Sequence, residues 1–414
     1  MNVLLVSPWF PSPAFGGALI RVFETLRHLS RSHHVTLLAP VDAPPAPDHL
    51  RALTDLGIEV NAVRVSEAGP SVAFRLARGL LRGRPLIQGL HFDAAMAREL
   101  RRLTARHAYD VIHVEHSFMA PYVSWISPES TARTVLSMHN IESLRFRREM
   151  HVARWGLRRL ALAADHVLFG SWEDRAVRQF DAIAAVSSLE QTWARDRAPS
   201  APVNLIPNGV NLKFFEPVQR TDTARAVVFT GLMNYPPNVD AVVWFCDEIL
   251  PLVRQRYADV TFSIVGDKPT AAVQALARRP GVEVWGRVPD VRPYLANADA
   301  LVVPVRSGAG TRLKILEAMA MRRPVVSTSQ GAEGLDVKPG SSILIGDSAA
   351  AFADQVCALL ANPRLGDALG QEGHRLVEER YGWPICFRGL DALYGSVARR
   401  PVLGDMAAVE AVAR

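Results

Sequence analysis

A short segment near residue 310 combines a glycine loop with charged residues at the start of a predicted helix. An apolar strand over Ala300–Val303 runs into a loop with two glycines, and apolar residues recur at helical spacing from about Thr311. A loop followed by a helix start presents backbone N–H groups and a positive dipole end, which favour an anion. Arg312 and Lys314 lie in the first turn, and Glu317 shares a helix face with Lys314. The segment predicts either a phosphate site with a carboxylate for sugar hydroxyls or a surface helix with a Lys314–Glu317 ion pair.

Polar residues also follow two predicted strands in the first half of the chain, over residues 110–116 and 134–138. In an open α/β sheet, ligands bind beside the carboxyl ends of the strands, so these polar residues are site candidates. A buried histidine that satisfies a backbone group is the alternative for each one alone. A metal site from His113, His116 and His139 is a less favoured alternative, because no close spacing of His, Asp and Glu fixes a coordination shell. The candidates are His113, Glu115, His116, His139, Asn140 and Glu142.

A glycine pair near the N-terminus is a second place where the backbone can approach a ligand. Gly16 and Gly17 end a proline-rich loop and stand directly before a helix predicted from about Ala18 to Ser30. This position suits anion binding at a helix start, and a plain turn is the alternative. The loop lacks the pattern GxGxxG, so a dinucleotide fingerprint is excluded.

Strands alternate with helices in two successive series. The strands of the first series are predicted over residues 2–6, 34–39, 59–65, 110–116, 134–138, 181–187 and 204–206. The strands of the second series are predicted over residues 226–230, 260–265, 282–285, 300–303, 325–327 and 343–345. This alternation predicts an α/β fold with two Rossmann-like parallel-sheet domains that face each other across a cleft.

Composition and charge limit the kinds of protein that the chain can be. Its 414 residues suit two domains, and 49% apolar with 21% charged residues is ordinary for a folded protein. The net charge of +6 comes from scattered basic residues, which favours anionic substrates or an anionic membrane surface over nucleic acid. The 3 cysteines lie far apart without a CxxC pair, so neither a zinc site nor a disulfide framework is predicted.

The expected location is cytoplasmic. The chain opens directly on a strand, and no uncharged run approaches the about 20 residues that a membrane helix needs. A basic amphipathic helix predicted over Ser71–Leu81 is a candidate for peripheral contact with the inner face of a membrane, with a solvated face as the alternative. The last dozen residues are expected to be loose.

Several short motifs follow one another in a specific order. In the first half they are Gly16-Gly17 and Asp110-Val111-Ile112-His113. In the second half they are Pro207-Asn208-Gly209-Val210-Asn211, Phe229-Thr230-Gly231, Val265-Gly266, Gly286-Arg287-Val288, Leu316-Glu317-Ala318-Met319-Ala320, Pro324-Val325-Val326 and Gly331-Ala332-Glu333-Gly334. Their order and spacing resemble retaining glycosyltransferases of the GT-B fold, most closely the large family 4 group.

The resemblance implies transfer of a sugar from a UDP- or GDP-linked donor to a glycan or lipid-linked acceptor, with retention at the anomeric carbon. The family needs no metal and no cofactor, and its commonest bacterial setting is polysaccharide or glycolipid assembly. The resemblance implies an acceptor-side domain over residues 1–207, a linker over 208–224 and a nucleotide-sugar-binding domain over 225–375. A helix and tail over residues 376–414 are expected to pack back on the N-terminal domain.

Site roles are carried over from the family residue by residue. Glu317 is implied to hold the ribose hydroxyls of the donor, and Gly16 and Gly17 to approach the diphosphate. The strand-end group from His113 to His116 is implied to lie near the transferred sugar. Further donor-side candidates are Asn208, Gly231, Gly310 and Thr311, and additional site candidates are Tyr235, Asn238 and Glu333.

Two positions depart from the family pattern. The first glutamate of the family's usual pair is replaced by Ala309, so its role at the donor sugar is lost or falls to neighbouring backbone groups. The family's cations after the first strand of the C-terminal domain are absent from residues 231–235. A diphosphate held away from water needs partner charges, so Arg312 and Lys314 are predicted to supply them.

Two other functions stay open. A non-catalytic relative that binds nucleotide sugars, or a partner subunit, is compatible with Ala309. A nucleotide-sugar 2-epimerase shares the two-domain architecture, but the helix pattern around Glu317 argues against it. A dehydrogenase is not expected without a dinucleotide fingerprint.

Overall fold

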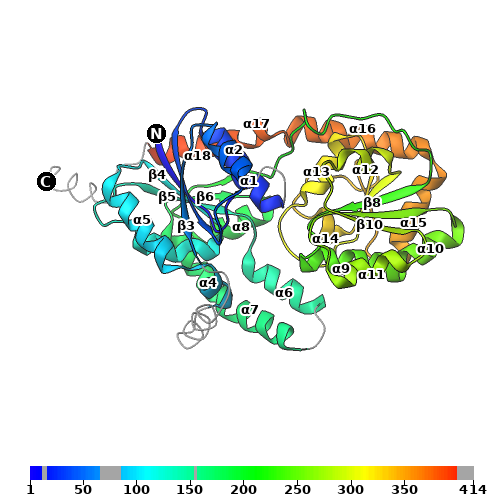
Figure 1. Cartoon of the computed structure of the whole chain (residues 1–414), viewed down its shortest axis with the longest axis horizontal. Coiled ribbons are helices and arrows are strands. Elements are labelled where there is room, and N and C mark those ends of the chain that lie inside the picture. Colours follow the sequence, from blue (N-terminus) through cyan, green and yellow to red (C-terminus); the bar gives the residue numbers. More distant parts are fainter. Residues whose placement is uncertain (12–15, 66–84, 153–155, 399–414) are drawn as a thin grey trace.

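Two parallel β-sheets, one in each half of the chain, organise the protein, as a computed structural model shows (Figure 1). The structure describes residues 1–11, 16–65, 85–152 and 156–398. The first sheet has the order β3-β2-β1-β4-β5-β6-β7, and the second has the order β10-β9-β8-β11-β12-β13. The strand pairs of both sheets are parallel. The predicted α/β fold with two Rossmann-like sheets is therefore confirmed.

The strands coincide closely with those predicted from the sequence. The N-terminal sheet contains β1 (Asn2–Val6), β2 (His34–Val41), β3 (Glu59–Arg64), β4 (Val111–Glu115), β5 (Arg133–Met138), β6 (Ala182–Ala185) and β7 (Val203–Leu205). The C-terminal sheet contains β8 (Ala226–Thr230), β9 (Thr261–Val265), β10 (Val282–Gly286), β11 (Ala300–Val303), β12 (Val325–Ser327) and β13 (Leu344–Ile345). Central strands such as β1 are apolar along their length because helices cover both sheet faces.

Helices connect the strands in both halves. Those of the first half are α1 (Gly17–Leu29), α2 (Pro47–Thr54), α4 (Leu86–His91), α5 (Ala94–Arg106), the 3-10 helix η1 (Ser117–Trp125), α6 (Glu142–Val152), α7 (Leu157–Ala176) and α8 (Ser188–Arg197). Those of the second half are α9 (Pro236–Trp244), the π-helix η3 (Phe245–Ile249), α10 (Leu250–Arg256), α11 (Ala271–Ala275), α12 (Arg292–Asn297), α13 (Leu313–Ala320), α14 (Ser329–Ala332) and α15 (Ala349–Ala361).

Helices α4 and α5 fill a stretch of the first half for which no element was predicted. The signal for α5 is present in the sequence, because Asp93 caps its first turn and accepts a hydrogen bond from the backbone N–H of Ala95. Its buried face then repeats at helical spacing through Met96, Leu100 and Leu103.

The end of the described chain returns to the first sheet. Helix α16 (Pro363–Arg380) packs on α13, and α17 (Trp383–Cys386) and α18 (Arg388–Ala398) follow it. Helix α18 contacts β6 and β7, and its residues Leu393 and Tyr394 share a buried cluster with Val3 and Leu5 of β1. The three helices run along one side of both domains in Figure 1. The last helix therefore contributes to the core of the N-terminal domain.

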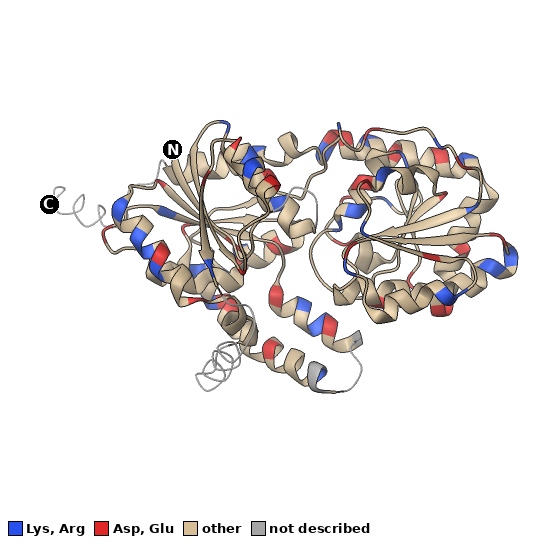
Figure 2. Ribbon diagram, viewed as in Figure 1, with Lys and Arg blue, Asp and Glu red and all other residues tan. Residues whose placement is uncertain are grey.

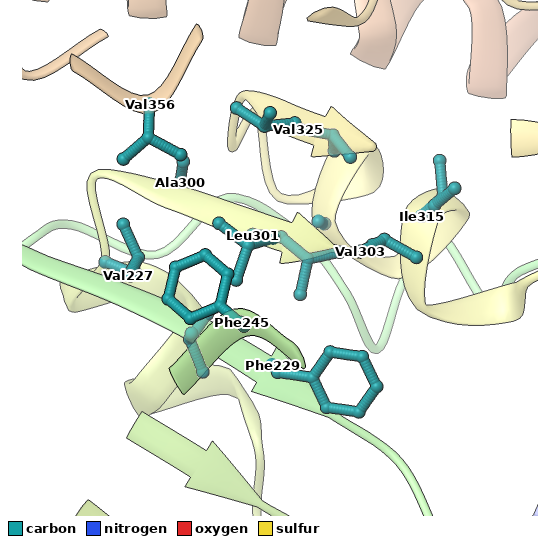
Figure 3. Close-up of a cluster of buried hydrophobic side chains, with 14 of the residues drawn as sticks. Val227, Phe229, Phe245, Ala300, Leu301, Val303, Ile315, Val325 and Val356 are labelled. Carbon is teal, nitrogen blue, oxygen red and sulfur yellow. The ribbon is translucent and has the colours of Figure 1, made fainter. Parts of the chain in front are cut away.

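The start of α13 is fixed by the core of the C-terminal domain. Ile315 is fully buried in one cluster with Phe229 of β8 and Val303 of β11 (Figure 3). Burying a side chain of this size contributes about 1.5–3 kcal/mol relative to leaving it exposed. Because β8 and β11 are neighbours at the point where strand order reverses, α13 begins beside the switch point of this sheet.

Some expectations lie outside the described residues. These are the basic helix over residues 71–81, the loose final dozen residues and residues 12–15 of the loop before the glycine pair. Within the described ranges, no helix has the length and apolar character needed to cross a bilayer. Figure 2 shows Lys and Arg interspersed with Asp and Glu on outer helices of both domains, including α5 and α16.

Candidate active site between the two domains

The loop before α13 has the conformation that its glycines allow. Gly308 and Gly310 have φ angles of 93° and 78°, in the left-handed region that favours glycine. The guanidinium of Arg312, at the N-cap of α13, donates hydrogen bonds to the carbonyl oxygens of Ala309 and Gly310 at 2.6 and 2.7 Å. A third bond reaches the carbonyl oxygen of Ser307 at 3.2 Å. Arg312 therefore stabilises the loop in which it was predicted to act as a phosphate-binding cation.

Lys314 reaches from the first turn of α13 to the end of β8. Its Nζ donates a hydrogen bond to Oδ1 of Asn238 at 3.2 Å and lies 3.6 Å from the centroid of the Phe229 ring. A Cβ atom added to Gly231 would lie 2.9 Å from this nitrogen. Lys314 thus bonds to Asn238 rather than forming the ion pair with Glu317 that a simple surface helix would show. Its charge lies where the sequence of residues 231–235 offers no cation.

Lys314 and Glu317 are ionisable residues that are buried and half-buried, respectively. Burial lowers the pKa of Lys314 well below its usual value, and the nearby Arg312 adds to this effect. Burial raises the pKa of Glu317 to about 7, and Lys314 only partly opposes this shift. Among the described parts of the chain, no side chain or backbone group hydrogen-bonds to the Glu317 carboxylate. Perturbed ionisable groups at a domain contact are typical of ligand sites.

The strand ends of the N-terminal domain carry a chain of buried polar side chains. Nδ1 of His113 lies 2.9 Å from the hydroxyl of Tyr394, and its Nε2 lies 3.3 Å from Oε1 of Glu115. Oε2 of Glu115 lies 2.6 Å from Nε2 of His139, which follows β5. Burial acts to raise the pKa of Glu115, but its contacts with His113 and His139 outweigh burial and hold the pKa well below its usual value. Glu115 is therefore a buried carboxylate ion between two imidazoles.

His116 directly follows β4 and has a strained backbone conformation. Its φ of 69° with ψ of 139° is rarely adopted by residues other than glycine. The ring stacks on His139 with centroids 3.8 Å apart, and Nδ1 lies 3.8 Å from Oε1 of Glu142. Both ring nitrogens are buried and have no hydrogen-bond partner within the described residues. Strain and unpartnered buried nitrogens in one residue are typical of functional sites.

Glu142 begins α6 and is tightly held. Its carboxylate accepts hydrogen bonds from Nε of Arg145 at 2.6 Å and from Nδ2 of Asn140 at 3.2 Å. Burial acts to raise the pKa of Glu142, but Arg145 and His116 outweigh it and lower the pKa far below its usual value. Glu173 of α7 accepts hydrogen bonds from backbone N–H groups in the first turn of α6 at 3.0 and 3.1 Å, and burial raises its pKa to about 7. Arg145 and Glu173 were not among the predicted residues, although the three-residue spacing from Glu142 to Arg145 was visible.

The domains touch each other at several of the predicted residues. A Cβ atom added to Gly310 would lie 2.4 Å from Oδ1 of Asn140, so only a glycine fits at this contact. Nδ2 of Asn208 donates a hydrogen bond to Oγ1 of Thr311 at 2.7 Å. Oδ1 of the same amide accepts a hydrogen bond from the buried Arg21 at 2.9 Å. Asn208 therefore links α1 to the loop before α13.

A salt bridge also crosses between the domains. Nη2 of Arg148 on α6 lies 2.7 Å from Oε1 of Glu333, which follows α14, and Nη1 donates to the carbonyl oxygen of Gly308 at 3.3 Å. The same glycine lies beside Tyr235, whose hydroxyl would be 3.4 Å from an added Cβ. Arg148 and Arg21 were missed because their partners are 185 and 187 residues away in sequence.

The predicted glycine pair lies at the same contact. Gly16 is the N-cap of α1 with a φ of 80°, and a Cβ atom added to Gly17 would lie 3.3 Å from Cδ1 of Leu313. The N-terminal ends of α1 and α13 therefore come together, and both present unpaired backbone N–H groups. In the described part of the chain, no group of three or more His, Cys, Asp or Glu could hold a metal ion.

Two Rossmann-like domains that meet at such strand ends and helix starts define the class of GT-B glycosyltransferases. The model of Glycosyltransferase Family 4 matches residues 15–214, and the model of Glycosyl transferases group 1 matches residues 224–362. The chain belongs to this family of glycosyltransferases and is an enzyme of this kind.

Two curated mannosyltransferases are similar to most of the chain. A GDP-mannose-dependent alpha-(1-6)-phosphatidylinositol monomannoside mannosyltransferase from Mycolicibacterium smegmatis is 27% identical over 92% of this chain and 95% of its own length. A phosphatidyl-myo-inositol mannosyltransferase from Mycobacterium leprae is 26% identical over 75% of this chain and 79% of its own length.

Solved structures share the fold across nearly the whole chain. Sucrose-phosphate synthase from Thermosynechococcus elongatus has a TM-score of 0.67 at 18% identity and covers 96% of this chain and 99% of its own. Anabaena Alr3699/HepE in complex with UDP-glucose has a TM-score of 0.65 at 14% identity and covers 96% of this chain and 100% of its own. At these identities the likeness concerns the fold alone.

Proposed function

We propose that this enzyme transfers a sugar from a UDP- or GDP-linked donor to a glycan or lipid-linked acceptor, with retention at the anomeric carbon and without a metal. The observation that carries the proposal is the place of Lys314, whose Nζ lies at the end of β8 beside Gly231. Its partner there is a neutral amide, so its charge is available to an anion. A diphosphate at this position would also face the N–H groups at the starts of α1 and α13.

Donor recognition would then rest on Lys314 and Glu317, which share one face of α13. Glu317 has a carboxylate with no protein partner in the described chain, and adjacent ribose hydroxyls can each donate a hydrogen bond to it. Burial disfavours the charged forms of Lys314 and Glu317. A bound diphosphate would restore the charge of Lys314, because a nearby anion favours the protonated amine.

These residues would act mainly by electrostatic stabilisation. The leaving group is a nucleoside diphosphate, and negative charge develops on it as the bond to the sugar breaks. A fixed ammonium group and helix-start N–H groups stabilise that charge without reorganising. Retention is proposed to follow from departure and attack on one face of the sugar, with the diphosphate helping to deprotonate the acceptor. The contacts between Gly310 and Asn140 and between Arg148 and Glu333 support a closed arrangement that limits hydrolysis of the donor.

The relatives indicate which substrates to test first. The name of the Mycolicibacterium smegmatis relative gives GDP-mannose as donor and a phosphatidylinositol mannoside as acceptor. We extend this to a lipid-linked or glycan acceptor in glycolipid or polysaccharide assembly, with the enzyme in the cytoplasm and in peripheral contact with a membrane. The N-terminal domain would face the acceptor.

The test is donor binding measured by thermal shift across UDP- and GDP-sugars, on the wild-type protein and on Glu317→Ala. Stabilisation by one donor that is lost in Glu317→Ala is the expected result, and unchanged binding after treatment with EDTA is expected too. Anomeric configuration is then read from the product by NMR. If no donor stabilises the wild-type protein and none is hydrolysed or transferred, the proposal is wrong and a non-catalytic relative, already compatible with Ala309, becomes the better account.

A further inference from the structure

Three polar side chains form a continuous link from α1 to the loop before α13. We use the name polar link for Arg21 on α1, Asn208 beyond β7 and Thr311, which directly precedes the N-cap of α13. Nη1 of Arg21 donates a hydrogen bond to Oδ1 of Asn208 at 2.9 Å, and Nδ2 of Asn208 donates one to Oγ1 of Thr311 at 2.7 Å. The polar link therefore crosses from one domain to the other.

Arg21 is a buried cation in the N-terminal domain. It is only 2% exposed, and its Nε atom has no hydrogen-bond partner among the described residues. Glu115 and Glu190 act on its charge through space, without a hydrogen bond. A buried cation without a bonded counter-charge is costly, and an apolar side chain of similar volume would avoid this cost. The guanidinium therefore indicates a task beyond packing.

That task follows from the direction of the hydrogen bonds in the polar link. A guanidinium only donates hydrogen bonds, so the amide of Asn208 must turn its oxygen atom toward Arg21. The NH₂ group of the amide then faces Thr311, and because this group also only donates, the hydroxyl oxygen of Thr311 must accept. A hydroxyl group has one proton of its own to donate. Arg21 and Asn208 thus direct that proton away from the amide.

The hydroxyl of Thr311 is fixed in position and its proton is available. Within the described ranges, no group accepts a hydrogen bond from this hydroxyl. A Cβ atom added to Gly334 would lie 2.9 Å from the Cγ2 methyl group of Thr311, so the methyl group packs against this glycine. Thr311 is partly exposed, and it stands beside the N–H groups at the start of α13. A ligand at this helix start can therefore reach the hydroxyl.

We propose that the hydroxyl of Thr311 donates a hydrogen bond to an oxygen atom of the nucleotide-sugar donor, and that Arg21 and Asn208 are positioning residues that fix the direction of this bond. This inference rests on the proposed function, because it needs a nucleotide sugar at the start of α13. The oxygen belongs either to the diphosphate or to the transferred sugar, and both accept a hydrogen bond from a hydroxyl group.

Calorimetric titration into variants of the full chain tests the hydroxyl. The ligands are UDP or GDP, whichever the wild-type protein binds more tightly, and the corresponding nucleotide sugar. Thr311→Val removes the hydroxyl and keeps a methyl group beside Gly334. If the bond goes to the diphosphate, the affinities for both ligands should fall about tenfold. If it goes to the transferred sugar, only the affinity for the nucleotide sugar should fall, by about fivefold.

Two further variants serve as controls for Thr311→Val. Thr311→Ser keeps the hydroxyl and should recover most of the lost affinity. Thr36→Val removes a buried hydroxyl that bonds to Glu59 at 3.4 Å, near the amino ends of β2 and β3 and away from the domain contact. It should leave the affinity for both ligands unchanged.

A double-mutant cycle tests the positioning role of Asn208. Asn208→Asp replaces the NH₂ group by a second acceptor oxygen, so the hydroxyl of Thr311 must donate to it and is lost to the ligand. The added charge also opposes a diphosphate, but that part of the effect is present with or without the hydroxyl. Asn208→Asp should therefore weaken binding about tenfold more in the wild-type protein than in Thr311→Val. Equal weakening in both would show that Asn208 does not act through Thr311.

The role of Arg21 is tested in the same way. Arg21→Met removes the group that orients the amide, whereas Arg21→Lys keeps a group that only donates. Arg21→Met should weaken binding more than Arg21→Lys does, and its effect should largely disappear in the Thr311→Val background. An undiminished effect in that background would show that Arg21 does not act through Thr311. If Arg21→Met fails to fold, Thr311→Val and Asn208→Asp still decide the inference.

Wild-type affinity of Thr311→Val for both ligands would overturn the inference. Failure of the proposed function is distinguishable from this result, because the wild-type protein would then bind neither the nucleoside diphosphates nor any nucleotide sugar.

Discussion

The two halves of the site handle charge in opposite ways. In the N-terminal domain, Glu115 and Glu142 are buried but ionised, because histidines or Arg145 hold them. In the C-terminal domain, Lys314 is also buried and Glu317 is half-buried, but neither has an oppositely charged partner within bonding distance among the described residues. Burial therefore lowers the pKa of the lysine and raises that of the glutamate.

This difference separates two tasks. A charged group that already has a partner in the protein gains little stabilisation from a charged ligand. A charged group without such a partner gains much more stabilisation from a ligand of opposite charge. The C-terminal half therefore binds the charged part of the donor in our account. The N-terminal half, in which the carboxylates of Glu115 and Glu142 already have partners in the protein, fixes the orientation of side chains around the sugar.

The largest expected effect tests the unpaired cation. Lys314→Met should lower kcat/KM by about 10²–10³-fold, because a fixed charge that stabilises the leaving group is removed. Steady-state transfer from the preferred nucleotide sugar measures this. Lys338→Met is the matched control, since Lys338 is an exposed lysine of the same domain. A loss no larger than in the control would mean that Lys314 does not contact the diphosphate.

The second prediction concerns the contact between the halves. Gly310→Ala should lower the transfer rate about 100-fold. The added Cβ would lie 2.4 Å from Oδ1 of Asn140, so the loop before α13 must shift away from this contact. Gly340→Ala separates backbone strain from this clash, since Gly340 has the same φ of 78° with open space around it. It should cost about 1 kcal/mol of stability and leave transfer intact. Equal losses of activity in Gly310→Ala and Gly340→Ala would show that transfer does not depend on the contact between Gly310 and Asn140.

A smaller effect is expected from the salt bridge between the domains. Arg148 and Glu333 are partly exposed, so a double-mutant cycle with Arg148→Ala and Glu333→Ala should give a coupling energy of about 1 kcal/mol in kcat/KM. The coupling should fall as salt concentration rises, because exposed charges are screened. A coupling energy of zero at low salt would show that this bridge does not help to hold the domains closed.

The smallest effect is a pH-dependent change in stability at Glu317. Its pKa is raised to about 7 in the folded protein, so the unfolded chain releases this proton first and stability falls as pH rises from about 4.5 to 7. Glu317→Gln removes that loss and should raise Tm at pH 8 by about 2–4 °C. The difference should largely vanish at pH 5, where the folded wild-type carboxyl is protonated. A lower Tm of the variant at pH 8 would contradict the absence of a protein partner for this carboxylate.

Much of the fold was predictable from the sequence, because each strand is a short apolar run followed by glycine or polar residues. The same local signals located the loop before α13 and the polar ends of β4 and β5. Contacts between distant segments were not predictable, as the pairs Arg21–Asn208 and Arg148–Glu333 show. Helix α5 was overlooked although its cap and apolar face are visible in the sequence.

The direction of side chains was the other feature that could not be predicted from the sequence. The sequence places Arg312 and Lys314 together in one helical turn and so gives them the same predicted role. In the structure, Arg312 turns back to the carbonyl groups of its own loop, whereas Lys314 reaches across to the end of β8. Arg312 turns back because carbonyl oxygens of the irregular loop accept hydrogen bonds from its guanidinium. The positions of these carbonyl oxygens cannot be predicted from residue types.

We propose that the C-terminal half binds the nucleoside diphosphate and that the N-terminal half orients the sugar. Calorimetric titration of UDP and GDP into Lys314→Met and Glu115→Gln tests it most directly, with the nucleotide that the wild-type protein prefers. Affinity is expected to fall at least tenfold in Lys314→Met and to stay at the wild-type value in Glu115→Gln. Equal weakening in both variants, or full affinity in Lys314→Met, would contradict this division of tasks.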